Sequence, residues 1–206
     1  MTTHDNVDDS GRLSRLGQLA ERAESTARWE DLTLPKAECE RLREIARRMK
    51  DQRSTADGTG YSVKASLRAG VTALFAGPSS PDKVAAAAAI ANHVNCGLYR
   101  VDLRRVVSQF IGETEKNLHR VCEEAELSGG VLLFEEGDAL FGKRTEVTDS
   151  HDRYANLETA DLLKRLEAYS GLAILSSNSR SAIEETAVRR FDYVIEFIEN
   201  SVRRNR

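Results

Sequence analysis

A short apolar run followed by a glycine, a polar loop and an alanine-rich helix constrains this chain most. Residues 71–76 are mainly apolar, Gly77 breaks the run, and Lys83 precedes the sequence Val-Ala-Ala-Ala-Ala-Ala-Ile. Strand, loop, lysine and helix in this order form the layout of a phosphate-binding loop, with the pattern G-x-x-x-x-G-K-[ST]. Gly77 and Lys83 have the required spacing, but Asp82 and Val84 stand where the pattern has glycine and serine or threonine. The sequence predicts the frame of a nucleotide site without several of its working groups.

Beyond this segment, short apolar stretches alternate with amphipathic helical patterns. The expected strands are 71–76, 98–103, 131–134, 172–175 and 193–197, and the expected helices are 83–94, 113–126, 152–169 and a short one near Ile183. This alternation is typical of an α/β fold with three layers, in which helices cover both faces of a parallel sheet, here of five strands. Ligands bind such sheets at the carboxyl ends of the strands. The loop after residue 76, the Glu135-Glu136 pair and Asn178 each follow a strand, so we expect them to share one cleft.

The residues before this core are organised differently. Residues 1–10 are polar and acidic and are expected to be disordered, while Leu13, Leu16, Leu19, Ala20 and Ala23 recur at helical spacing. An amphipathic helix here would either dock on the body or contact a partner. Residues 29–35 are interpreted as an extended connector, 36–50 as a helix and 51–60 as a mobile loop. The predicted domains are therefore 1–28, a core from 29 to 200, and a short basic tail from 201 to 206.

Charge and cysteine content narrow the class of protein. The formal net charge is −3, which gives no general reason to expect a nucleic-acid partner. Cys39, Cys96 and Cys122 are widely separated, as in a reduced chain without a disulfide framework. The polar N-terminus has no apolar signal core, and no stretch approaches the length of a membrane span. We expect a cytoplasmic protein that does not insert into a membrane.

Several further motifs occur in a specific order. They are Gln109-Phe110-Ile111-Gly112-Glu113-Thr114-Glu115-Lys116-Asn117, then Phe134-Glu135-Glu136-Gly137-Asp138-Ala139-Leu140-Phe141, then Asn178, and finally Arg189-Arg190-Phe191-Asp192. Together with the loop at Gly77, they resemble the pore loop, Walker B segment, sensor-1 asparagine and arginine-finger segment of AAA+ ATPases of the AAA group. The stretch from Gly142-Lys143-Arg144 to Asp152-Arg153-Tyr154-Ala155-Asn156 resembles bacterial single-module AAA proteins, some of which accompany contractile injection systems.

The resemblance implies a role for each matched residue. Glu136 is the base that orients the attacking water, and Glu135 replaces the aspartate that usually holds the Mg²⁺ shell. Asn178 positions a water or a γ-phosphate oxygen. Arg189 and Arg190 act across a subunit boundary in a neighbour's site. Phe110, Ile111 and Gly112 would grip an extended polypeptide in a central pore. The phosphate-binding segment comprises Gly77, Pro78, Ser79, Ser80, Pro81, Asp82, Lys83 and Val84.

The phosphate-binding segment departs most from the family pattern. Where the family has Gly-Thr-Gly before the lysine, this chain has Ser80-Pro81-Asp82. Pro81 has no N–H to donate to a phosphate, and Val84 supplies no oxygen to Mg²⁺. Asp82 brings a carboxylate towards the phosphates, and at ~4 Å and an effective dielectric near 20 one such repulsion is about 4 kcal/mol before screening. The C-terminal end at residue 206 leaves no room for the family's small helical lid, which we therefore expect to be absent.

Blander interpretations remain for single motifs. Glu135-Glu136 would then be a solvated strand end, Arg189-Arg190 a surface pair binding Asp192 or Glu185, and Phe110 a core side chain. Their order on this fold favours descent from an ATP site. Three functions stay open: a pseudo-ATPase that is a scaffold or regulatory subunit in a protein-remodelling assembly, an active ATPase acting on protein complexes, and a nucleotide sensor without turnover. ATP and Mg²⁺ are expected if the chain is active, and no cofactor if it is a scaffold; the expected partners are proteins, either another AAA subunit or a second copy.

Overall fold

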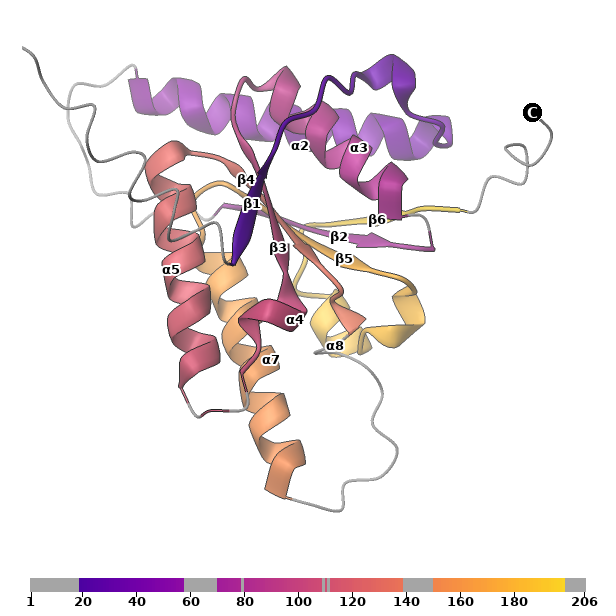
Figure 1. Cartoon of the computed structure of the whole chain (residues 1–206). Helices are drawn as coiled ribbons and strands as arrows, with labels where there is room; N and C mark the ends of the chain where they lie inside the picture. Colours follow the sequence, from indigo (N-terminus) through magenta and orange to yellow (C-terminus); the bar gives the residue numbers. More distant parts are fainter. Residues whose placement is uncertain are drawn as a thin grey trace, which may run out of the picture.

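A six-stranded, mostly parallel sheet forms the centre of the molecule, with the strand order β1-β3-β4-β5-β2-β6 (Figure 1). The computed structural model describes residues 19–57, 70–78, 80–108, 110, 112–138 and 150–198. Strands β2 to β6 are parallel to one another, and the edge strand β1 pairs with β3 in the antiparallel direction. The strands are β1 (Ala20–Ala23), β2 (Val71–Ala76), β3 (Leu98–Asp102), β4 (Val131–Glu135), β5 (Leu172–Ser177) and β6 (Tyr193–Glu196).

Helices cover both faces of the sheet, as the alternating pattern predicts. On one face lie α2 (Lys36–Asp57) and α3 (Ser80–His93), and on the other lie α5 (Glu113–Ser128) and α7 (Ser150–Ala168) (Figure 1). Each face has its own apolar core because successive strand residues point to opposite sides. In β4, for example, Leu133 packs with the α2 and α3 residues and Leu132 with the α5 and α7 residues. The fold is thus a three-layer α/β structure, which confirms the predicted class.

The N-terminal edge strand corrects one prediction. Ala20 and Ala23 were expected on an amphipathic helix, but residues 20–23 form β1 and extend the sheet beside β3. Residues 13–18 of the expected helix lie outside the described residues. The strand forms because β3 would otherwise present an open row of N–H and C=O groups at the sheet edge, and pairing satisfies them. The sheet therefore has an antiparallel sixth strand in addition to the five that were predicted.

A connector ties β1 to the α3 layer. The Asn92 side chain donates to the carbonyl oxygens of Ser25 and Ala27, both at 2.9 Å. The Trp29 indole donates to Nδ1 of His93 at 3.3 Å, within the 3-10 turn η1 (Trp29–Asp31). These contacts hold the connector of residues 24–35 across the C-terminal end of α3. They hold the chain that follows the edge strand β1 against α3.

Shorter elements complete the fold. Asp102 caps α4 (Leu103–Val106) by accepting from the backbone N–H of Arg104 at 3.0 Å. A 3-10 turn η3 (Arg180–Ala182) and the helix α8 (Glu185–Val188) link β5 to β6. Helix α2 continues to Asp57, so residues 51–57 are helical where a mobile loop was expected. Within the described ranges, no helix has the length and apolar character that a membrane crossing would need.

Candidate functional site

The carboxyl ends of β4, β5 and β2 lie side by side, and the predicted site residues gather there. Strand β5 pairs with both β4 and β2. Glu135 ends β4, Asn178 follows β5, and Gly77 follows β2. A backbone hydrogen bond from Gly77 N to Ser177 O, 3.0 Å long, joins two of these ends. The expectation that the loop, the acidic pair and Asn178 meet at one edge is consistent with this arrangement.

The loop between β2 and α3 is shorter than the sequence motif predicts. The helix was expected to begin at Lys83, but α3 begins at Ser80, and Ser80, Pro81 and Asp82 form part of its first turn. The chemistry of these residues explains the early start: proline is well tolerated in a first turn, and an acidic side chain there interacts favourably with the helix dipole. Ser79 lies outside the described residues. The segment that would wrap around phosphates in the family pattern is therefore largely helical.

Lys83 is buried rather than presented to a ligand. Its side chain is 1% exposed, and Nζ donates to Gly77 O at 2.7 Å and to Ser177 O at 2.9 Å. Burial lowers the pKa of Lys83, and the nearby carboxylates of Asp138, Glu136 and Glu135 oppose that shift. Two of the three ammonium donors are thus used to join the ends of β2 and β5. The lysine that would contact phosphate in the family pattern is an internal tie between strands.

Gly77 is required by packing. Its φ is +134°, and a Cβ at this position would lie 1.9 Å from the carbonyl oxygen of Phe197. The two chain segments are held close together here by a hydrogen bond of 2.7 Å from Phe197 N, just beyond β6, to Ala76 O. Glycine is the residue that combines this backbone conformation with so close a neighbour. The first glycine of the motif therefore has a structural reason that does not involve a ligand.

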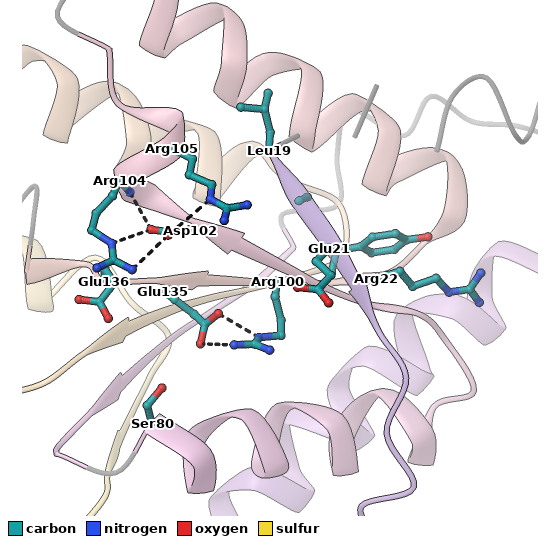
Figure 2. Close-up of a pocket in the computed structure, with 12 residues that line it drawn as sticks. Leu19, Glu21, Arg22, Ser80, Arg100, Asp102, Arg104, Arg105, Glu135 and Glu136 are labelled. Carbon is teal, nitrogen blue, oxygen red and sulfur yellow. Dashed lines mark hydrogen bonds and ion pairs between the residues drawn. The ribbon is translucent and has the colours of Figure 1, made fainter. Parts of the chain in front are cut away.

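Glu135 is held by an arginine that the sequence interpretation did not include. Arg100 Nε donates to Oε2 at 2.9 Å, and Nη2 donates to Oε1 at 3.1 Å (Figure 2). The hydrogen bond to Glu135 raises the pKa of Arg100, against the opposing effect of burial. In the parallel pair, Arg100 lies opposite Leu133, so Glu135 is its diagonal neighbour on the same face of the sheet. The sequence feature that could have indicated this pair is an arginine in β3, the strand next to the one that ends in Glu135.

Two further acidic residues, Glu136 and Asp138, follow β4, and Asp138 holds the backbone at the end of β5. Glu136 has a φ of +61°, in the left-handed region. Asp138 accepts a hydrogen bond of 2.6 Å from Ser177 Oγ and one of 2.8 Å from the Asn178 N–H. Asn178 itself is exposed. The Asp138 carboxylate thus joins the acidic segment after β4 to the end of β5 and fixes the backbone position of Asn178.

The two predicted finger arginines differ in their environments. Arg190 makes two short bonds to Glu167 of α7, Nε to Oε1 at 2.6 Å and Nη2 to Oε2 at 2.8 Å. Arg189 has a side chain that is 79% exposed and lies 3.9 Å from a carboxylate oxygen of Glu185. The Asp192 carboxylate accepts from the backbone N–H of Thr72 at 2.9 Å instead of binding either arginine. Arg189 is therefore the more accessible of the two cations.

The candidate pore-loop residues are partly described. Phe110 is 63% exposed, which excludes the alternative of a core phenylalanine. Gly112 has a φ of +78° and stands just before α5, where it ends the loop. Ile111 lies outside the described residues. The exposed aromatic ring is available for contact with another molecule, and its role in a pore stays a prediction.

A polar cleft of about 510 Å³ lies beneath β1, beside the N-terminal end of α3 (Figure 2). Its charged lining residues balance in number: Arg22, Arg100, Arg104 and Arg105 against Glu21, Asp102, Glu135 and Glu136. Arg104 forms two bonds of 3.1 Å to Asp102, and Arg100 is bound to Glu135. Much of the charge in this cleft is thus already neutralised within the protein.

The donor set does not fit Mg²⁺ bound to a nucleotide. Mg²⁺ requires near-octahedral oxygen ligands, and the position of the usual hydroxyl is Val84, which packs against the α2 and α3 core. Both Glu135 oxygens accept from Arg100. In the part of the chain that the structure describes, no three histidine, cysteine, aspartate or glutamate side chains could hold a metal ion together. In the phosphate loop, Pro81 has no N–H to donate, and Lys83 is buried and bonded to backbone carbonyls.

Comparison with family models gives one match. The model described as the ATPase family associated with various cellular activities (AAA) matches residues 73–198, more than half of the chain. A cell division cycle protein 48 homolog of Archaeoglobus fulgidus is 30% identical over 127 residues, which are 60% of this chain and 17% of that protein. A proteasome-activating nucleotidase of Thermococcus gammatolerans is 31% identical over 130 residues, 60% of this chain and 33% of that protein. The chain thus spans a third or less of these two relatives.

Solved structures agree at the level of fold. The crystal structure of the FIGL-1 AAA domain superimposes with a TM-score of 0.64 at 18% sequence identity, covering 94% of this chain and 62% of that one. The same domain in complex with ADP gives a TM-score of 0.62, with 96% and 64% covered. Because the identity is low, these matches support the three-layer architecture and carry no statement about what this chain binds.

Proposed function

The chain belongs to the AAA family of ATPases, and from that premise we propose that it is a degenerate member, a scaffold or regulatory subunit of a protein-remodelling assembly in which ATP hydrolysis is impaired or lost. The observation that carries the proposal is the position of Lys83. The residue is 1% exposed and its ammonium group donates to two backbone carbonyls, so binding a phosphate would require these bonds to break. Members of this family typically use ATP and Mg²⁺.

The surrounding residues support the same proposal. Helix α3 already begins at Ser80, so its first turn occupies the segment that would curve around phosphates. Both carboxylate oxygens of Glu135 are bound by Arg100. Glu136 and Asn178 keep residue types suited to hydrolysis, yet groups that orient a water contribute little when phosphate and metal are not held. The early start of α3 and the binding of Glu135 by Arg100 both favour a chain that keeps the fold without hydrolysing ATP.

A protein partner is part of the proposal. Arg189 is exposed at the end of α8 and is free to reach a neighbouring molecule. Phe110 exposes an aromatic ring at the loop before α5. Cations and aromatic rings are common contributors at protein interfaces. We propose that the neighbour is another AAA subunit or a second copy of this chain.

An assay of phosphate release tests the proposal. The purified chain at millimolar ATP and Mg²⁺ is expected to match the Glu136→Gln variant, with both at the background rate. A triple variant, Pro81→Thr with Asp82→Gly and Val84→Thr, restores the motif residues and is the matched comparison for the loop. Turnover by the unmodified chain that Glu136→Gln abolishes would reject the proposal in favour of an active ATPase. Phosphate release that appears only in the triple variant would show that the loop is what disables the site.

A further inference from the structure

The pairing of Arg100 with Glu135 bears on Mg²⁺ binding, which is separate from phosphate binding by the loop. Glu135 stands where the family carries the carboxylate of the Mg²⁺ shell, and it is the one acidic residue of the strand β4 itself. We propose that the Arg100 guanidinium neutralises Glu135 in place of the divalent cation. The carboxyl end of β4 would then bind no Mg²⁺, whatever the state of the phosphate loop. The inference rests on the proposed function and deepens it at the metal position.

The geometry of the pair supports this replacement. Two N–H groups of one planar guanidinium reach the two oxygens of one carboxylate, at 2.9 and 3.1 Å. Such two-point pairs combine direction with charge, and an arginine is permanently charged. A metal ion approaching Glu135 would meet a fixed positive charge and would have to displace both bonds. The carboxylate is thus saturated by a side chain of the same sheet.

The pair is partly buried, and its carboxylate is the less exposed of the two groups. The Glu135 side chain is 15% exposed and the Arg100 side chain 37%. Strand β1 lies beside β3 in the sheet, with Glu21 directly opposite Arg100 in the antiparallel register. The adjacent arginines, Arg104 and Arg105, are directed to Asp102 and not to Glu135. Arg100 is therefore the cation assigned to Glu135, and a neighbouring pair of the same chemistry offers a matched control.

The test measures binding of Mn²⁺, a spectroscopic substitute for Mg²⁺, by electron paramagnetic resonance without nucleotide. The unmodified chain is expected to bind no Mn²⁺ at a site sensitive to Glu135→Gln. Arg100→Gln is expected to gain Mn²⁺ binding in the millimolar range at this site, because a positive charge is removed beside a carboxylate. Arg104→Gln, which frees Asp102 in the same cleft, is expected to leave Mn²⁺ binding at Glu135 unchanged. The double variant Arg100→Gln with Glu135→Gln should lose the gain.

Two results would overturn the inference. One is Mn²⁺ binding by the unmodified chain that Glu135→Gln abolishes, and the other is a folded Arg100→Gln variant that gains no binding. If Arg100→Gln fails to fold, the Arg100 Nε–H signal in the NMR spectrum of the unmodified chain decides. Broadening of that signal by Mn²⁺ beyond the broadening seen for Arg104 would contradict the replacement, and equal or weaker broadening would support it. ATP turnover is not measured here, so failure of this inference is distinct from failure of the proposed function.

Discussion

At the scale of single residues, Lys83 occupies the lysine position of the phosphate-loop motif but donates to the backbone of its own chain. A buried ammonium ion is costly unless hydrogen bonds compensate its lost hydration. Here the Gly77 and Ser177 carbonyl oxygens provide that compensation, and three carboxylates lie near enough to influence its pKa. The lysine has become part of the packing between β2, β5 and α3. Its substitution should therefore be felt in stability, whether or not a nucleotide is present.

Replacing Lys83 by methionine is expected to lower the free energy of unfolding by about 2 kcal/mol, because two buried charge-assisted bonds are lost and the Gly77 carbonyl keeps no ammonium donor. Chemical denaturation measures the change. Lys164→Met, at an exposed position of α7, is the control and should alter stability by less than about 0.5 kcal/mol. Equal stabilities of the two variants would show that Lys83 is not a structural tie.

The spacing of Gly77 and Lys83 indicated a phosphate-binding loop, and the order of the further motifs indicated the family, but neither gave the direction of the lysine side chain. Motif spacing follows the chain, whereas the bonds to Ser177 depend on β5, which is distant in sequence and adjacent in the sheet. Arg100 was overlooked for the same reason, since Glu135 becomes its neighbour only through the register of β3 and β4. A local sequence pattern does not show which residues of distant strands lie opposite each other, so these side-chain contacts could not be predicted from it.

At the scale of elements, the structure is most regular where the sequence alternates most clearly. Strand β2 spans residues 71–76 as predicted, because a continuous apolar run bounded by glycine is typical of a buried parallel strand. The sequence Ala-Glu-Arg-Ala of β1 has no such signature, and its spacing with earlier leucines favours a helix. Pairing with the open edge of β3 outweighed local preference there. The first turn of α3 was missed because the motif, rather than helix propensity, set the expected boundary.

The junction of β2 with β6 offers a test at this scale. Gly77→Ala is expected to cost at least about 3 kcal/mol of stability, because the new Cβ would meet Phe197 O at 1.9 Å and the backbone φ of +134° is strained for alanine. Gly112→Ala is the matched control, since its φ of +78° is also positive but nothing lies within 4 Å of the new Cβ. Its expected cost is about 1 kcal/mol. Thermal or urea unfolding compares the two, and similar losses would contradict the close packing of Gly77.

At the scale of the whole molecule, the AAA architecture is retained while the changes concentrate at one edge of the sheet. Two apolar cores sandwich the sheet, and neither depends on a ligand. On the α2 and α3 side, Lys83 donates to the carbonyl oxygens of Gly77 and Ser177, and Arg100 pairs with the carboxylate of Glu135. Alternation of strands and helices was sufficient to predict the layers. The internal neutralisation of the site is a property of the assembled sheet, and no local motif reveals it.

Calorimetric titration of ATP into the purified chain, with and without Mg²⁺, tests the central claim most directly. The account predicts no detectable heat of binding at millimolar nucleotide in either condition, because Lys83 is bonded within the protein and both oxygens of Glu135 are bound by Arg100. ADP serves as the comparison without a γ-phosphate. Binding in the micromolar range, strengthened by Mg²⁺, would contradict the account and show that these internal bonds open readily to a nucleotide.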